Sequence, residues 1–132
     1  MNRLEISISS EVGNIVKVES FIETFTTCFG LSSKLFGKIS LSVIEAVNNA
    51  ILAGNKQDVN KQVTVTAEKE DDRLRVTVAD EGEGFDYTHI PDPTDPDNLD
   101  RVTGRGLYLM KTLSDEIVFE NNGATVTLVF NL

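Results

Sequence analysis

The sequence contains one cysteine, Cys28, and one histidine, His89, among its 132 residues. A single cysteine excludes an internal disulfide and a cysteine metal cluster, and a single histidine likewise excludes a histidine metal cluster. Cys28 is flanked by Phe25, Thr26, Thr27 and Phe29. Because free cysteine is among the most buried residue types, we expect a buried structural thiol here.

Positive charge is also scarce, since 12 Lys and Arg residues stand against 21 Asp and Glu residues and give a net charge of −9. Nucleic acid is therefore not an expected partner, because its phosphates require Lys and Arg. Many of the acidic residues fall between Glu68 and Asp100. A nucleotide can still bind such a chain where a cation and backbone amides neutralise its phosphates locally, and acidity leaves room for a basic protein partner.

Long hydrophobic runs are missing as well. No apolar run approaches the ~20 residues that span a bilayer, and residues 1–8 alternate like a strand instead of forming the apolar block of a signal peptide. We therefore expect a cytoplasmic protein that does not enter a membrane. The length of 132 residues, with 40% hydrophobic and 25% charged residues, predicts one globular domain over residues 1–132.

Hydrophobic periodicity predicts an α+β domain: a mixed, mostly antiparallel sheet with its helices on one face. Helix caps, Gly30 and an Asn-Gly pair mark the boundaries between elements. The expected elements are a strand over 4–9, a helix over 12–29 ended by Gly30, a helix from Ser32 or Ser33 to Ala53 with its regular part after Gly37, strands over 62–69 and 73–79 joined at Asp71-Asp72, a loop over 85–103, a helix over 104–114, and a hairpin of 116–120 and 125–131 with an Asn122-Gly123 turn.

The second of these helices is apolar on nearly every side. Aliphatic residues three and four apart define a face that should pack on the sheet, and further aliphatic residues cover much of the remainder. We therefore expect this helix to be buried almost all round. The sheet-facing residues are Phe36, Ile39, Val43, Val47 and Ala50, and the others are Leu41, Ile44, Ile51 and Leu52.

A narrow polar stripe on that helix carries Ser42, Glu45 and Asn49. Glu45 and Asn49 are four residues apart and stack on successive turns. Buried unpaired, such groups would cost a few kcal/mol, so one interpretation is that they bond to nearby backbone or water. In the other, the carbonyl oxygen of Asn49 binds Mg²⁺, a cation that prefers oxygen ligands, and Glu45 acts as a general base.

The stretch Asp80-Glu81-Gly82-Glu83-Gly84 follows an apolar strand. A carboxylate at a strand end can accept a hydrogen bond from an exocyclic amine such as that of adenine. Gly82 and Gly84 would let the backbone approach a flat ring closely. An ordinary acidic turn is the alternative.

The stretch Thr103-Gly104-Arg105-Gly106-Leu107 is predicted to open the third helix. Glycines at a helix N-terminus expose backbone N–H groups and the positive end of the helix dipole, which suits phosphate. Arg105 could add a charge-assisted contact, and the loop over 85–103 would then act as a lid. A flexible loop-to-helix junction is the alternative.

Taken together, these stretches resemble the ATPase superfamily shared by gyrase, heat-shock chaperones and sensor histidine kinases, whose fold is a two-layer α/β sandwich. The similarity is closer still to the bacterial anti-sigma factor serine/threonine kinases of the partner-switching type. It covers nearly the whole chain. It rests most on Glu45-Ala46-Val47-Asn48-Asn49-Ala50, Asp80-x-Gly82-x-Gly84 and the run from Gly104 to Met110. One departure is Ala53, which stands where relatives often carry a histidine.

The resemblance implies a role for each matching residue. Asn49 would bind Mg²⁺ and Glu45 would activate the attacking serine hydroxyl, while Asp80 would hydrogen-bond the adenine amine of ATP. The remaining residues would shape the nucleotide pocket: Gly82 and Gly84 around the base, and Asn48, Thr103, Gly104, Arg105, Gly106 and Leu107 on the phosphate side.

The same resemblance implies a homodimeric kinase that phosphorylates an anti-sigma factor antagonist and also binds a sigma factor. We expect the first strand and first helix to form the dimer surface. An alternative is an ATP-gated protein-binding module that transfers no phosphoryl group. A detached sensor histidine kinase domain is disfavoured, because no histidine lies in a helical dimerisation segment.

Overall fold

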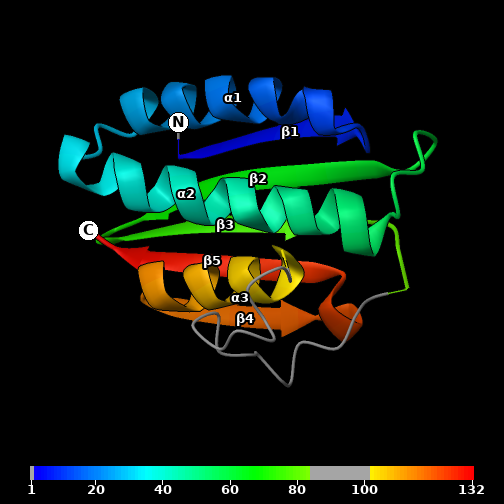
Figure 1. The fold of residues 1–132 in the computed structure, drawn as a ribbon. Coiled ribbons are helices and arrows are strands. Elements are labelled where there is room, and N and C mark those ends of the chain that lie inside the picture. The colour runs from blue at the N-terminus through cyan, green and yellow to red at the C-terminus, as the bar shows by residue number, and fades with distance from the viewer. Residues whose placement is uncertain (1, 84–101) are drawn as a thin grey trace.

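The computed structural model describes residues 2–83 and 102–132, with the backbone alone for residues 102–105. Three helices lie on one face of a five-stranded sheet, with α2 between α1 and α3 (Figure 1). Every strand pair is antiparallel, in the order β1-β2-β3-β5-β4. The predicted α+β two-layer architecture is thus confirmed. The elements are β1 (Arg3–Ser9), η1 (Val12–Asn14), α1 (Ile15–Cys28), α2 (Ser33–Asn49), η2 (Ala50–Gly54), β2 (Gln62–Glu70), β3 (Arg73–Ala79), α3 (Val102–Leu113), β4 (Glu116–Glu120), η4 (Asn121–Gly123) and β5 (Thr125–Asn131).

The helix ends follow local chemistry. Gly30 has a φ of +65° just beyond α1, a conformation that glycine adopts at little cost. Ser32 caps α2 by accepting a hydrogen bond from the Lys34 N–H at 3.2 Å. The helix is regular from Ser33 onward, so the expectation that Gly37 delays its start is wrong. At its far end α2 passes into η2, a single π-helical turn.

The predicted turns and hairpins are confirmed. Asp71 (φ 50°) joins β2 to β3, and Asn121, Asn122 and Gly123 have positive φ between β4 and β5. Short polar residues and glycine tolerate this backbone region better than branched ones. The predicted loop over 85–103 falls mostly outside the described residues.

The core lies between the sheet and the three helices. Alternate residues of the central strands point into it, as in the exposed–buried alternation of β3, because successive strand side chains face opposite sides of the sheet. The helices supply residues three and four apart. The buried set includes Val18, Ile22 and Phe25 of α1, Ile39, Val43 and Val47 of α2, Leu107 and Met110 of α3, and Val63, Val65, Leu74, Val76, Val78, Leu128 and Phe130 of the strands.

Two burial expectations are wrong. Cys28 is exposed, because it falls on the outer side of the last turn of α1 while Phe25 and Phe29 turn inward. Leu41 and Leu52 are 45% and 40% exposed. The helix therefore has a solvent-facing side after all, on the side turned away from the sheet.

The continuous helix Ser33–Gly54 is the one described segment whose length (22 residues) and mean hydropathy (1.3) would suffice to cross a membrane. The core helix of a soluble protein passes the same test. Val43 and Val47 of this segment are fully buried, because their side chains point from the helix into the core between the helices and the sheet.

Candidate nucleotide site

The side chains of the polar stripe on α2 differ in whether the described residues satisfy their hydrogen bonds. Ser42 is fully buried, and its hydroxyl donates to the Lys38 carbonyl at 2.6 Å, so helix backbone satisfies it. Asn49 is 9% exposed, and its Oδ1 atom is buried with no hydrogen-bond partner among the described residues. Buried carbonyl oxygens are nearly always paired. The unpaired Asn49 oxygen thus fits a cation ligand better than it fits a purely structural asparagine.

Glu45 lies one helical turn before Asn49, about 6 Å along the axis at 1.5 Å per residue. Its side chain is half-buried and faces α3. The ideal Cβ position of Gly106 lies only 2.9 Å from Glu45 Oε2. Because glycine has no side chain, α3 can approach the Glu45 carboxylate this closely.

The start of α3 differs from the expectation. The helix begins at Val102, so Thr103, Gly104 and Arg105 belong to its first turn, whose N–H groups lack intrahelical acceptors. Gly106 already lies in the second turn, where it makes room for Glu45. The side chain of Leu107 is 2% exposed and lies in the core, so any contact with a nucleotide would be left to its backbone.

The π-helical turn η2 brings the end of α2 against the end of β3. Its hydrogen bond runs from the Asn55 N–H to the Ala50 carbonyl at 2.8 Å, five residues apart. Gly54 of this turn contacts the Asp80 carboxylate so closely that a Cβ at Gly54 would overlap it. A Cβ at Gly82 would overlap the Gly54 carbonyl. Single π turns are frequent at functional sites, and this one brings the predicted Asp80 and Gly82 against the end of the helix that carries Glu45 and Asn49.

Asp80 itself is held at the end of β3 by its backbone. Its N–H donates to the Ala124 carbonyl at 2.8 Å, and its Oδ1 accepts from the Gly82 N–H at 2.8 Å. Burial raises the pKa of Asp80 above its usual 3.8, more strongly than the Gly82 hydrogen bond and the Lys61 charge lower it. The Asp80 carboxylate is costly to bury and has only one described hydrogen bond. It is therefore well suited to accept a hydrogen bond from a ligand.

The predicted residues therefore form two clusters along one helix. Asp80 and Gly82 meet Gly54, which was not predicted, at the end of η2. Glu45, within α2, meets Gly106 of α3, and Asn49, the last residue of α2, lies between the two clusters. This order matches an extended nucleotide with its base at Asp80 and its terminal phosphate near Glu45. Asn48 is half-buried beside Asn49 without a described role, and Gly84 lies outside the described residues.

Gly54 and Asn55, which directly follow the predicted helix, were not identified as site residues from the sequence. Asn55 is 1% exposed, and its side chain makes three hydrogen bonds, one of them to the turn after Asp80. The sequence feature that could have identified Asn55 is its place as a polar residue directly after a mostly apolar helix.

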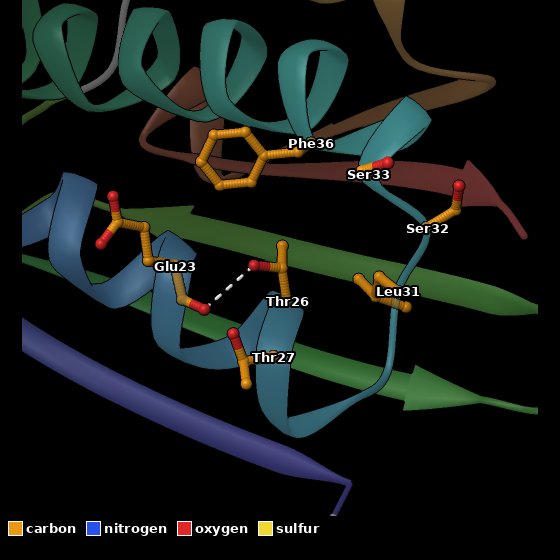
Figure 2. A pocket seen from close by; sticks show the side chains of 7 residues that line it. All are labelled: Glu23, Thr26, Thr27, Leu31, Ser32, Ser33 and Phe36. Atoms are coloured by element: carbon orange, nitrogen blue, oxygen red, sulfur yellow. Dashed lines mark hydrogen bonds between the residues drawn. The ribbon is translucent and has the colours of Figure 1, made fainter.

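A separate pocket of about 390 Å³ lies where the end of α1 meets the start of α2 (Figure 2). The pocket is lined by Phe36, Leu31 and Thr26, among others. The Thr26 hydroxyl donates a hydrogen bond to the Glu23 carbonyl at 3.0 Å. None of the predicted site residues contributes to this pocket. It is therefore distinct from the candidate nucleotide site.

The fold and the site together define an ATPase-type nucleotide-binding domain. The family model of the histidine kinase-like ATPase domain matches residues 8–130, and the chain belongs to this family. ATP as its ligand follows from that membership.

Within the family, the relatives are named serine-protein kinase RsbW. The one from Bacillus subtilis (strain 168) is 37% identical over 68% of this chain and 61% of its own length. The one from Bacillus velezensis is 30% identical over 95% of this chain and 82% of its own length. The resemblance to anti-sigma factor serine/threonine kinases is thereby confirmed. This chain spans less than two thirds of the Bacillus subtilis relative.

A solved structure supports the fold independently. The crystal structure of the RsbU and RsbW domains of a Mycobacterium tuberculosis protein superposes with a TM-score of 0.71 at 20% identity. The match covers 100% of this chain and 33% of that chain.

Proposed function

We propose that this protein is an ATP-dependent serine/threonine kinase that phosphorylates a protein partner. The observation that carries the proposal is the buried Asn49 Oδ1, which has no hydrogen-bond partner among the described residues and lies one turn from Glu45. A nucleotide-binding module needs no base at the phosphate end of its site, whereas a transferase gains from one. The names of the relatives point the same way.

The residues present fit magnesium. Mg²⁺ usually takes one or two protein oxygens and completes its shell with water and substrate phosphates. Asn49 offers such an oxygen. In the described part of the chain, no group of three or more His, Cys, Asp or Glu residues could hold a metal, so a site shared with ATP phosphates suits this chain better than an all-protein site. When bound, the cation would neutralise charge developing on the phosphates.

Glu45 would act on the substrate hydroxyl. Its carboxylate accepts the hydroxyl proton as the serine oxygen bonds to the γ-phosphorus and the bond from that phosphorus to the β–γ bridging oxygen breaks, leaving ADP. The first-turn N–H groups of α3 would hold the phosphates in place. Such catalysis rests mainly on positioning and electrostatics, and the close contact of Gly106 with Glu45 keeps the base aligned.

Partners are part of the proposal. We infer that the phosphorylated protein is an anti-sigma factor antagonist and that a sigma factor is the second partner, in a homodimeric cytoplasmic protein. The names of the RsbW relatives, serine-protein kinases, support phosphorylation of a protein serine, and the partners and the homodimer rest on the resemblance to anti-sigma factor kinases. The surface of β1 and α1 is the proposed dimer interface.

The test begins with partners captured by the full chain with and without ATP and Mg²⁺, followed by phosphosite mapping. Glu45→Gln is expected to lower transfer to the captured partner by about 10²- to 10⁴-fold, the usual contribution of a general base, while ATP binding stays nearly intact. Glu120→Gln, an exposed glutamate at the end of β4 and far from the proposed dimer surface, is the matched control. Unchanged transfer by Glu45→Gln would remove Glu45 from its role. ATP binding without transfer by the unaltered protein would favour the ATP-gated module.

A further inference from the structure

The side chain of Asn55 joins four segments at the base end of the nucleotide site. Its Nδ2 donates to Ser10 Oγ at 2.7 Å, just after β1, and to the Gln62 carbonyl at 3.0 Å, at the start of β2. Its Oδ1 accepts from the Glu81 N–H at 2.8 Å, in the turn after β3. Asn55 itself follows η2. Both donors and an acceptor of one buried amide are thus in use.

The orientation of this amide is fixed by its partners. A reversed amide would place its oxygen against the Gln62 carbonyl and its NH₂ group against the Glu81 N–H, which would lose both bonds. Ser10 is in turn held in place, because its hydroxyl donates to the Lys61 carbonyl at 2.7 Å. Since Asn55 is 1% exposed and Ser10 is fully buried, loss of these bonds would leave unsatisfied groups.

The Glu81 N–H is the connection to the site. Glu81 lies between Asp80 and Gly82, and its own carboxylate accepts from the Gln62 N–H at 2.7 Å. Asn55 therefore fixes the middle of the turn whose two ends carry the predicted base contacts. Its neighbour Gly54 contacts both of those ends. Nothing else described ties the Glu81 backbone to the end of the α2–η2 helix.

We propose that Asn55 is a positioning residue that sets the purine selectivity of the site by fixing the Asp80–Gly82 turn against the end of the α2–η2 helix. The inference rests on the proposed contact between Asp80 and the adenine amine. A hydrogen bond discriminates between ligands only when its acceptor is held in place, because a mobile acceptor can turn to water instead.

The experiment compares binding of ATP with binding of purine riboside 5′-triphosphate, which lacks the exocyclic amine, to the full chain. We expect the unaltered protein to prefer ATP by about tenfold or more, the size of a hydrogen bond to a charged group. Asn55→Ala should lower that preference by roughly threefold or more. A general loss of stability would weaken both nucleotides together and leave their ratio unchanged.

Two further variants keep the test decisive. Ser10→Ala removes one hydrogen bond of Asn55 without changing any residue of the Asp80–Gly82 turn. It should also lower the preference for ATP over purine riboside triphosphate. Asn14→Ala is the matched control, because the Asn14 amide also makes two hydrogen bonds near the end of β1, both to Ser9. It should change thermal stability while the ratio stays at the unaltered value.

The outcomes separate the two proposals. An unaltered protein that shows no preference for ATP would overturn the role of Asp80 and the proposed nucleotide contact with it. A clear preference that Asp80→Ala abolishes but Asn55→Ala and Ser10→Ala both retain would overturn the role of Asn55 alone.

Discussion

Asp80 carries a cost of folding that the proposed contact with a nucleotide would offset. Its carboxylate is half-buried at the end of β3, where one backbone N–H and the more distant Lys61 charge compensate its burial only in part. The raised pKa of Asp80 records this imbalance, because burial disfavours the charged form. A bound adenine would supply the hydrogen-bond donor that the folded chain does not.

Asp80→Asn should therefore change the pH dependence of stability. Asp80 has a raised pKa in the folded chain, so its contribution to stability is fully present below the usual 3.8 and is lost as pH rises through the raised pKa. Asparagine cannot ionise, so the free energy of unfolding of Asp80→Asn should rise relative to the unaltered protein over that window. Urea unfolding from about pH 3 to about pH 7 measures this difference. A difference that does not change with pH would contradict the expectation.

At the scale of elements, the contact between α2 and α3 makes the position of Glu45 depend on how these two helices pack. Gly106 of α3 lies close to the Glu45 carboxylate of α2. The neighbouring Leu107 and Met110 anchor α3 in the core. The position of Glu45, the proposed base, is thus set by a second helix as well as by its own.

Gly106→Ala should separate stability from activity. Alanine is favoured over glycine inside a helix by about 1 kcal/mol. The new methyl group would meet Glu45 Oε2, the flexible end of that side chain, at 2.9 Å and its Cβ at an ordinary 3.8 Å. Stability should therefore stay level or rise. The displaced carboxylate should lower transfer by up to about 10²-fold, the effect of a misplacement near 1 Å.

Gly37→Ala is the control for that variant. Gly37 also lies inside a helix, α2, and a Cβ there would meet nothing within 4 Å. It should gain a similar stability in thermal unfolding with transfer unchanged. Equal transfer rates in the two alanine variants would show that Gly106 is not needed to place Glu45.

Much of this arrangement could be predicted from the sequence. Period-3.6 and period-2 patterns gave the helices and strands to within a few residues, and Ser32, Gly30 and the Asn122-Gly123 turn marked their ends through local chemistry. Glu45 and Asn49 could be placed together because helix geometry fixes neighbours four residues apart.

The long-range contacts of the site could not be predicted in this way. The contact of Gly54 with Asp80 and the bonds of Asn55 to Ser10 and Glu81 join segments 26 to 45 residues apart in the chain, and no local pattern records them. The π turn that aligns them also breaks the regular helical period. The exposed Leu41 and Leu52 were misjudged because helix periodicity shows which side faces the sheet but not how far neighbouring helices cover the rest.

At the scale of the whole molecule, a single helix passes through the full length of the site. α2 packs on the sheet, contacts α3 at Glu45, ends at Asn49 and meets Asp80 through η2. Because this one continuous helix takes part in both clusters, a ligand that bridges them should stabilise the entire fold and not one loop.

Thermal unfolding with ATP and Mg²⁺ tests this coupling together with the metal ligand. At 100 times the dissociation constant, a ligand specific for the folded state adds about 2.7 kcal/mol, or about 10 °C for a chain of this size. Asn49→Ala should reduce the shift to the value that the unaltered protein shows with ATP and EDTA. Without nucleotide the variant should unfold at a similar temperature, because the removed oxygen has no described partner. Asn60→Ala, at an exposed loop position, should keep the full shift. An equal response of the Asn49 and Asn60 variants to Mg²⁺ would show that the Asn49 oxygen is not the cation ligand.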